Sequence, residues 1–287
     1  MGEDSISVQT RNPYSRPRKS RLSAPRFAKT VGLPKMISAL TRKILRALGI
    51  IIHKKSTGVF LSEDDLPELM FRLCNKRNPR IVDGGSHQGK FVIDLRRLAP
   101  DAEFLCFEPQ PELYAFLSRR FADDPAVTVV EEALGKESGT MDLHCNEGLA
   151  TSSFLEASPR VKGSLGHLLI PRHKIKVNVS TLDEALARHR WDFVDIIKLD
   201  LQGSEYSALV GASSALGKAR VVAVEVWFAP LYQNVPDYLS LAKLMENRGF
   251  RLFSLSGLHY SMEDRLLWAD AIFVREDSSV WKAAIRG

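Results

Sequence analysis

The sequence predicts an open α/β domain built on a mostly parallel sheet and preceded by a basic N-terminal segment. From about Ser62 onward, short apolar runs alternate with amphipathic segments of helical period, which is the pattern of consecutive βαβ units. The first apolar run ends in Gly84 and Gly85, and a turn of this kind lies at the ligand-binding edge of a parallel sheet. With 287 residues and 45% hydrophobic content, the chain can bury one large core.

The apolar runs and amphipathic segments place the individual elements. Seven runs predict the strands of the main sheet, at 80–83, 103–107, 127–131, 194–200, 221–226, 250–255 and 266–274. Helical spacing predicts helices at 63–75, 91–98, 111–121, 182–188, 205–212 and 238–247. Two further strands, at 139–144 and 174–179, flank a polar loop rich in Ser and Gly. We expect this loop to be an insertion that covers the site.

The N-terminal segment differs from the rest of the chain in charge. Residues 1–60 contain 13 of the 40 Lys and Arg residues but only two acids, so they carry a formal charge of +11 and the remainder carries −5. Residues 1–34 are rich in Ser, Pro and Arg without an apolar period, which predicts disorder. Residues 35–60 form a linker or a basic amphipathic helix, because apolar residues recur at helical spacing from Lys35 to Ile52.

This predicted helix has two interpretations. It either packs on the folded domain or contacts an anionic membrane surface through residues 35–52. A further alternative is that translation begins at Met36. The catalytic domain is predicted to span residues 61–287.

Composition limits the class of protein. No apolar stretch approaches the roughly 18 to 20 residues of a membrane-spanning helix. Cys74, Cys106 and Cys145 are far apart and lack zinc-ligand spacing, which favours a reducing compartment. We therefore expect a cytoplasmic protein, with peripheral contact at the inner membrane surface as an alternative. No nucleic-acid partner is expected, because the domain has no basic strip interleaved with aromatic residues.

The loop that follows the first strand predicts a nucleotide-like cofactor. Gly84 and Gly85 permit close backbone approach, and Gly89 opens the next helix. The dinucleotide fingerprint GxGxxG would require glycine at position 87, where this chain has His87. Asp83 precedes the glycines and suits a cofactor that carries an ammonium and a sulfonium but no phosphate. This favours S-adenosylmethionine (SAM) over NAD.

The ends of the next two strands extend this site. Glu108 follows the second strand, 25 positions after Asp83, where a carboxylate can accept both hydroxyls of an adenosine ribose. Ala133 and Leu134 follow the third strand, where backbone amides would border an adenine ring.

These motifs, taken together and in order, resemble the FkbM family of SAM-dependent methyltransferases. The resemblance covers residues 81–274 and rests on Asp83 to Gly89, Phe107-Glu108-Pro109, Ala133-Leu134-Gly135, Ser152-Ser153, Lys198 to Glu205 and Val224-Glu225-Val226. It implies a class I methyltransferase (Rossmann-like) fold, with one antiparallel strand in the seven-stranded sheet and helices on both faces. It also implies O-methylation, with a hydroxyl of a sugar, glycan, glycolipid or polyketide-type product as the acceptor. Gln202 stands where many members carry Glu.

The residues expected to bind the cofactor are Asp83, Gly84, Gly85, Ser86, Gly89, Glu108, Pro109, Ala133, Leu134 and Asp200.

The acceptor side is expected at the ends of the fourth and fifth strands. Asp200 is the first candidate for the base or for the group that orients the acceptor, because methyl transfer to a hydroxyl requires removal of its proton. Lys198 either tunes the pKa of Asp200 and binds acceptor oxygens or forms a buried pair with Glu225. Glu225 is either catalytic or this structural partner. Glu205 is either catalytic or a cap of the helix that it begins.

Weaker candidates complete the predicted site. A Mg²⁺ ion held by Asp200 and Glu225 is an alternative to the metal-free site that we expect. His87 and His259 are alternative bases. Aromatic residues that could stack on a sugar are Trp227, Tyr232 and Tyr238, and the acceptor is expected to be selected by loops 146–172 and 227–236.

Two other functions remain open at this point. The same fold could carry an NAD-dependent oxidoreductase. Alternatively, the basic N-terminal segment could tether a non-enzymatic binding protein to a membrane or a nucleic acid.

Overall fold

The computed structural model of the chain describes residues 6–10, 50–54, 66–148, 151–159, 169–229, 231–261 and 264–281. The chain divides into two units, residues 1–62 and residues 63–287. The predicted domain boundary at residue 61 lies beside this division.

In the N-terminal unit, strand β1 (Ile6–Thr10) pairs antiparallel with strand β2 (Ile50–Lys54), with Ile6 opposite Lys54. We had predicted disorder for residues 1–34 and a helix reaching Ile52, and these two strands differ from both expectations. The three consecutive isoleucines that open β2 are β-branched and favour extended backbone. Residues 35–49 lie outside the described residues, so the predicted membrane contact stays a prediction.

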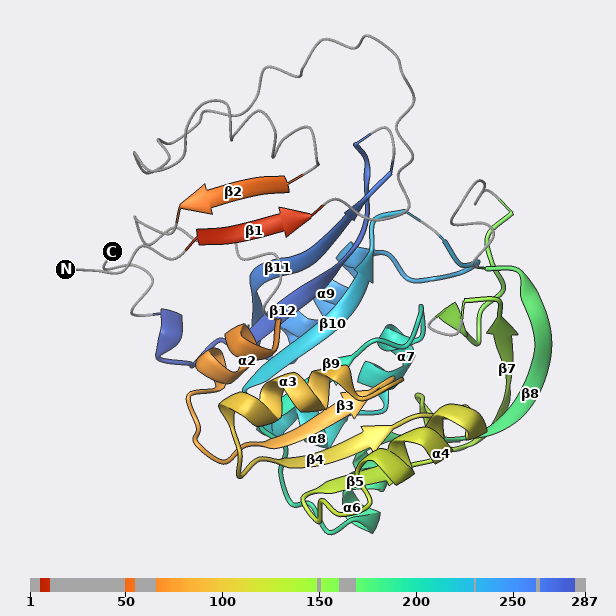
Figure 1. Cartoon of the computed structure of the whole chain (residues 1–287), viewed down its shortest axis with the longest axis horizontal. Coiled ribbons are helices and arrows are strands. Elements are labelled where there is room, and N and C mark those ends of the chain that lie inside the picture. The colour runs from red at the N-terminus through yellow and green to blue at the C-terminus, as the bar shows by residue number, and fades with distance from the viewer. Residues whose placement is uncertain are drawn as a thin grey trace, which may run out of the picture. The chain divides into compact units, whose positions relative to one another are not determined.

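The second unit is built on a seven-stranded sheet in the order β11-β12-β10-β9-β3-β4-β5 (Figure 1). Its strands are β3 (Arg80–Gly84), β4 (Glu103–Phe107), β5 (Val127–Val130), β9 (Ile196–Leu199), β10 (Val221–Trp227), β11 (Phe250–Tyr260) and β12 (Leu266–Arg275). Strand β12 pairs antiparallel with both neighbours, and the other neighbouring strands pair in parallel. The predicted fold class, with one antiparallel strand, is confirmed.

The strand order places a crevice between β3 and β9. From β3 the chain continues to β4 on one side, whereas from β9 it continues to β10 on the other side. In open α/β sheets, this reversal of strand order leaves a crevice at the carboxyl ends of the two central strands. The loops after β3 and β9 meet there.

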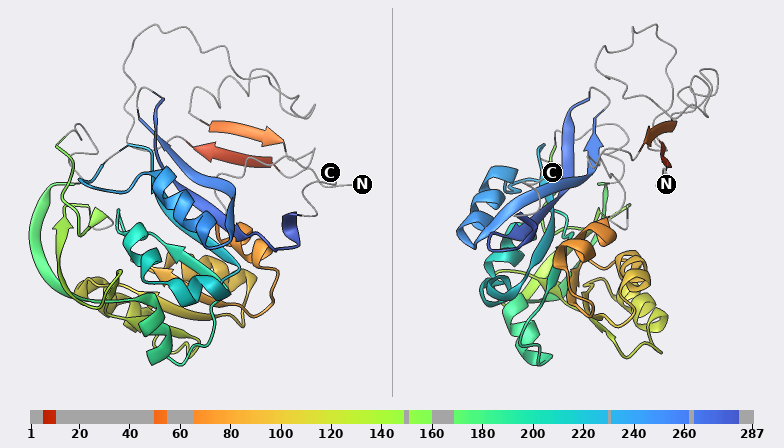
Figure 2. Two further views of the ribbon diagram at one scale, coloured as in Figure 1. Left: turned by 180° about the vertical axis from the view of Figure 1, so that it is seen from behind. Right: turned by 90° about the vertical axis from the view of Figure 1, so that its left-hand side faces the viewer.

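Apolar side chains alternate between two faces of the sheet, and helices cover both (Figure 2). Ile81, Ile196 and Val221 pack with residues of α2 and α3, while Val82 and Ile197 pack with residues of α6 to α9. The helices are α2 (Leu66–Cys74), α3 (Lys90–Leu98), α4 (Pro111–Arg120), α6 (Leu182–Arg188), α7 (Glu205–Val210), α8 (Ser213–Lys218) and α9 (Tyr238–Asn247). Within the described residues, no helix is long and apolar enough to cross a membrane.

A small second sheet carries the insertion. Strand β8 (Pro171–Ser180) pairs antiparallel with β7 (Gly139–Asn146) and in parallel with the two-residue β6 (Ala133–Leu134). The two predicted extra strands are therefore present and are longer than expected. Part of the polar loop between them, residues 151–159, is described and lies over the site.

Candidate active site

A cleft of about 570 Å³ lies at the carboxyl ends of β3, β4 and β9. It contains six of the residues predicted to bind the cofactor: Gly85, Glu108, Pro109, Ala133, Leu134 and Asp200. Four other predicted residues do not line the cleft: Asp83, Gly84, Ser86 and Gly89. Asp83 and Gly84 end strand β3, and Ser86 and Gly89 belong to the loop that follows it and supports the cleft.

The loop after β3 depends on glycine at position 85. Gly85 has a φ of +75°, and a Cβ atom added there would lie 2.0 Å from the backbone oxygen of Asp200. This contact is with the main chain and cannot be relieved by a side-chain movement. The loop therefore passes against the end of β9 only because Gly85 has no side chain. Ser86 fastens the same turn, since its Oγ donates to the backbone oxygen of Asp83 at 2.8 Å.

Glu108 is buried at the end of β4 and is held by two backbone amides. Its Oε2 accepts from the N–H of His87, and its Oε1 accepts from the N–H of Gln110, both at 3.0 Å. Burial raises the pKa of Glu108, although the two amides act in the opposite direction. Each carboxylate oxygen has a further acceptor direction. The side chain of Gln110 also bonds to this carboxylate, so about one acceptor direction remains for a group in the cleft.

Lys198 and Asp83 form a buried ion pair beneath the cleft. The Nζ of Lys198 lies 3.1 Å from Asp83 Oδ1 and 3.8 Å from Asp200 Oδ2, and it donates to the backbone oxygen of Gly85 at 3.2 Å. Burial acts to lower the pKa of Lys198, but Asp83 and Asp200 outweigh it and the pKa lies above its ordinary value. Lys198 is therefore a fixed positive charge.

This geometry corrects two expectations. The described carboxylates within 4.0 Å of Lys198 are Asp83 and Asp200, not Glu225, because Lys198 is aligned with Asp83 in the β3–β9 register. Asp83 is fully buried and does not line the cleft, so direct contact with a cofactor ammonium is not supported. Its contribution is to hold Lys198 and the loop.

Asp200 faces the cleft, and its side chain is 40% exposed. Its Oδ1 accepts from Nε2 of Gln202 at 2.8 Å, and the same nitrogen donates to Oε2 of Glu225 at 3.0 Å. The hydroxyl of Tyr232 donates to Oε1 of Gln202 at 2.9 Å. Gln202 had no predicted role, and the sequence signal that could have indicated one is a long polar side chain between two acidic strand ends.

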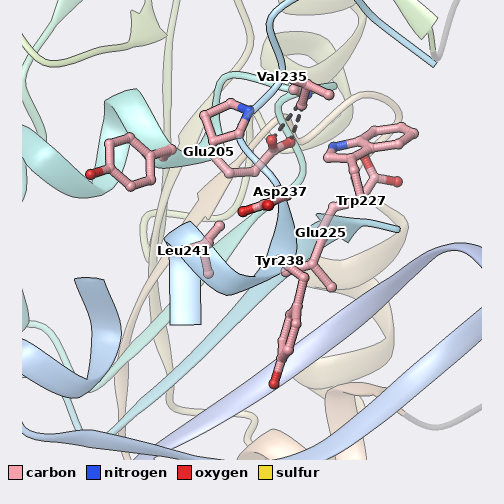
Figure 3. Close-up of a pocket in the computed structure, with 11 residues that line it drawn as sticks. Glu205, Glu225, Trp227, Val235, Asp237, Tyr238 and Leu241 are labelled. Carbon is pink, nitrogen blue, oxygen red and sulfur yellow. Dashed lines mark hydrogen bonds between the residues drawn. The ribbon is translucent and has the colours of Figure 1, made fainter. Parts of the chain in front are cut away.

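Glu205 is the first residue of α7, whose N-cap residue is Ser204, and its carboxylate bonds to the turn before the helix instead of capping it. Its carboxylate accepts from the N–H of Leu201 at 2.7 Å and from the N–H of Gly203 at 3.1 and 3.0 Å. These bonds fix the turn between β9 and α7 and occupy the group that was also a candidate catalyst. Figure 3 shows the Gly203 bonds as dashed lines.

Glu205 also lines a recess together with Glu225 and Trp227 (Figure 3), and this recess has a volume of about 200 Å³. The surrounding side chains leave no room in it for a sphere the size of water. The cleft that contains Glu108 and Asp200 is therefore the better ligand site.

The remaining candidates divide between the cleft and the core. His87 lines the cleft, and burial lowers its pKa although Asp200 opposes this. His259 stacks on Trp268 with ring centroids 4.4 Å apart. Tyr238 stacks on Phe228 at 5.3 Å, so Tyr238 is a packing residue.

Glu225 is buried against several acids. Burial raises its pKa well above the ordinary value, with Asp200, Glu205 and Asp270 adding to the effect and Lys198 opposing it. No group of three His, Cys, Asp or Glu side chains suited to a metal ion occurs in the described part of the chain.

The two loops predicted to select the acceptor are joined to each other. The N–H of Ser158 donates to the oxygen of Leu231, and the N–H of Gln233 donates to the oxygen of Glu156, both at 2.8 Å. Ser153 Oγ in turn donates to the backbone oxygen of Gln202 at 2.6 Å. We call residues 151–159 and 231–235 the strap. It links both loops to the turn after β9.

Comparison with known proteins decides the family. The family model described as "Methyltransferase FkbM domain" matches residues 83–252, which is more than half of the chain. The chain belongs to the FkbM methyltransferase family. The predicted family and the prediction of a methyltransferase are thereby confirmed. An oxidoreductase and a non-enzymatic tether were the alternatives, and neither matches this assignment.

Relatives of this FkbM methyltransferase include two curated proteins. The 2-O-methyltransferase NoeI of Sinorhizobium fredii strain NGR234 is 25% identical over 166 residues, covering 56% of this chain and 68% of NoeI. The methyltransferase sdnD of Sordaria araneosa is 29% identical over 219 residues, covering 67% of this chain and 78% of sdnD.

Among solved structures, Aeropyrum pernix fibrillarin with bound S-adenosyl-L-methionine gives a TM-score of 0.41 at 11% identity, covering 70% of this chain and 68% of that one. The fold class given above rests on the strand order of this FkbM methyltransferase itself.

Proposed function

We propose that this chain transfers a methyl group from SAM to a hydroxyl of a small-molecule acceptor, with Asp200 as the base. The acceptor classes that we expect are a sugar, a glycan or glycolipid, and a polyketide-type alcohol. The observation that carries the proposal is that one cleft contains both Glu108, a buried carboxylate with free acceptor capacity, and Asp200, a half-exposed one. The name of the relative NoeI, a 2-O-methyltransferase, agrees with a hydroxyl acceptor.

The residues of the cleft fit SAM. Glu108 can accept a ribose hydroxyl, and the apolar side chains of Phe107, Leu134 and Leu201 line the cleft beside it. Gly85 brings the main chain close to the cleft without a Cβ in the way. A dinucleotide pyrophosphate is held by closely approaching backbone N–H groups at such a loop, and His87 stands where the dinucleotide fingerprint requires glycine. When bound, SAM supplies an electrophilic methyl group.

The chain's own groups would align the acceptor and remove its proton. Asp200 accepts a hydrogen bond from the acceptor hydroxyl and takes the proton as the new carbon–oxygen bond forms. The ammonium of Lys198 lies 3.8 Å from Asp200 Oδ2 and helps to hold this carboxylate in place. The strap restricts access of water to the acceptor side.

Titration calorimetry with SAM and with NADH tests this assignment of the cofactor. We expect wild-type protein to bind SAM in about the micromolar range usual for substrates and to bind NADH with no detectable heat. Tight binding of NADH together with no binding of SAM would overturn the proposal.

A further inference from the structure

We propose that Gln202 is a positioning residue that keeps the carboxylate of Asp200 oriented and ionised by linking it to Glu225 and Tyr232. The inference rests on the proposed function, in which Asp200 is the base. Gln202 itself acts only through its hydrogen-bond partners, and it does not line the cleft.

Four hydrogen bonds fix this residue. Its Nε2 donates to Asp200 at 2.8 Å and to Glu225 at 3.0 Å, and its Oε1 accepts from Tyr232 at 2.9 Å. Its backbone oxygen accepts from Ser153 of the strap at 2.6 Å. Both N–H bonds of the amide and its carbonyl oxygen are therefore used at once.

The chemistry of the partners determines which way the amide points. An ionised carboxylate only accepts hydrogen bonds, so the NH₂ group must face Asp200, and Oε2 of Glu225 accepts its second N–H bond. The phenol of Tyr232 then supplies the donor for the carbonyl side at 2.9 Å, with the backbone oxygen of Thr151 as a second acceptor at 3.1 Å. Tyr232 is 1% exposed and its ring lies edge-on to Trp227, with centroids 5.4 Å apart, so packing holds this donor in place.

The backbone of Gln202 shows that the position is constrained. Its φ is +53°, in the left-handed region that costs a non-glycine residue free energy. The following amide, that of Gly203, donates to Glu205. The turn therefore holds Gln202 in an unfavourable conformation that directs its side chain between two acids.

A neutral donor suits this place because its surroundings are already acidic. Charged and titratable groups come from every element around it: Lys198 on β9, Glu225 on β10, Glu205 on α7, Asp270 on β12, His259 on β11, His87 after β3 and Tyr232 on the strap. Lys198 is the fixed cation among them. A carboxylate at position 202 would be a third acid within hydrogen-bond distance of Asp200 and Glu225, and neighbouring like charges oppose ionisation.

The test measures the protonation of Asp200 directly and needs no acceptor. Full-length protein labelled with ¹³C at the aspartate carboxyls is titrated by NMR, and the Asp200 signal is assigned as the one missing from Asp200→Asn. In Gln202→Glu we expect the pH midpoint of the Asp200 carboxyl titration to rise by about one pH unit or more. A midpoint equal to that of wild type would overturn the inference.

Gln233→Glu is the matched control. Gln233 follows Tyr232 in the strap, is exposed and bonds to Glu156 and Ala157 instead of to the acidic cluster. The chemical change is identical, so we expect the Asp200 midpoint of this variant to match wild type. An equal rise in both variants would also overturn the inference, because it would show a general effect of added charge.

Tyr232→Phe provides a second test if Gln202→Glu does not fold. It removes the hydroxyl that fixes the carbonyl of Gln202 and leaves the ring in place. We expect the side-chain NH₂ signals of Gln202 to shift in ¹⁵N spectra and the Asp200 midpoint to rise, while calorimetry finds unchanged SAM affinity. Unchanged NMR signals would count against the inference. Failure of SAM binding in wild type would instead count against the proposed function.

Discussion

The ammonium of Lys198 on β9 lies 3.1 Å from the carboxylate of Asp83 on β3, joining the two strands that flank the crevice. Asp83 is fully buried and Lys198 is 9% exposed. A charge buried this deeply is tolerated when its partner compensates it, and loss of one partner is more costly than loss of both. The pair therefore supports the site from beneath.

Lys198→Met should lower the free energy of unfolding by about 3–5 kcal/mol, because it leaves Asp83 buried and unpaired. The double variant Lys198→Met/Asp83→Asn should be more stable than Lys198→Met alone. Urea denaturation measures both. Lys90→Met is the control, because Lys90 is 88% exposed in its pair with Asp94, and its loss should cost less than about 0.5 kcal/mol. Equal losses for Lys198→Met and Lys90→Met would contradict the account.

Gly85→Ala should abolish SAM binding and lower the melting temperature. The new Cβ would lie 2.0 Å from the backbone oxygen of Asp200, at a φ of +75°, so the loop must move away from β9. Calorimetry with SAM and thermal denaturation check the two effects. Gly217→Ala in α8 is the control, because a Cβ there meets no atom within 4 Å, and alanine favours a helix by about 0.5–1 kcal/mol. Wild-type SAM affinity in Gly85→Ala would be inconsistent with the placement of the cofactor.

Glu108→Gln should weaken SAM binding by roughly tenfold or more, since a hydrogen bond to a charged group contributes about 1.5–3 kcal/mol. Burial raises the pKa of Glu108, so wild-type affinity should also fall on acidification at a pH above the usual range of a glutamate. Calorimetry across a pH series measures both effects.

Glu103→Gln is the control for this substitution. Glu103 lies at the other end of β4, and its side chain is 50% exposed, so its replacement should leave SAM affinity unchanged. If Glu103→Gln and Glu108→Gln bound SAM equally well, Glu108 would not be a cofactor ligand.

Glu225 and Asp270 should make the protein more stable in mild acid than in base. Burial raises the pKa of Asp270 to about 6, with Asp200 adding to the effect and Lys198 opposing it, and burial raises that of Glu225 as well. The folded state then keeps protons that the unfolded chain has released. The stabilisation of the folded state by these two groups is fully present below pH about 4, where Asp and Glu of the unfolded chain are protonated. It is lost as the pH rises through the pKa values of the folded state.

Melting temperatures across pH about 4 to 8 test this contribution. Glu225→Gln and Asp270→Asn each replace one of these carboxyl groups by an amide that does not titrate. Each variant should therefore show a smaller fall in melting temperature with rising pH than wild type. Parallel curves for wild type and both variants would contradict the direction of the shifts.

The sequence was sufficient to predict what depends on local pattern. Apolar runs located the strands of the main sheet, and helix Leu182–Arg188 has the predicted bounds. Strand β11 runs to Tyr260, five residues beyond the prediction, because pairing with β12 continues through polar residues that break the apolar run. Strand β1 pairs with a segment some 40 residues later, and composition contains no signal for such a contact.

Side-chain partners were harder to predict than elements. One of the two interpretations of Lys198 paired it with Glu225, because strand order alone does not give the register that aligns Lys198 with Asp83. Glu205 had two interpretations until its backbone partners were seen. The role inferred for Gln202 depends on contacts with Asp200 and Tyr232, which only the folded turn and the strap bring together.

Methylation with SAM that carries a deuterated methyl group is the most direct test of the central claim. Wild type and Asp200→Asn are incubated with a panel of sugars, glycolipids and polyketide alcohols, and products are located by mass spectrometry. We expect wild type to place the labelled methyl on a hydroxyl oxygen of at least one acceptor, and Asp200→Asn, at SAM concentrations that saturate each protein, to methylate about a hundredfold or more slowly. Labelling on nitrogen or carbon, or equal rates for the two proteins, would contradict the account.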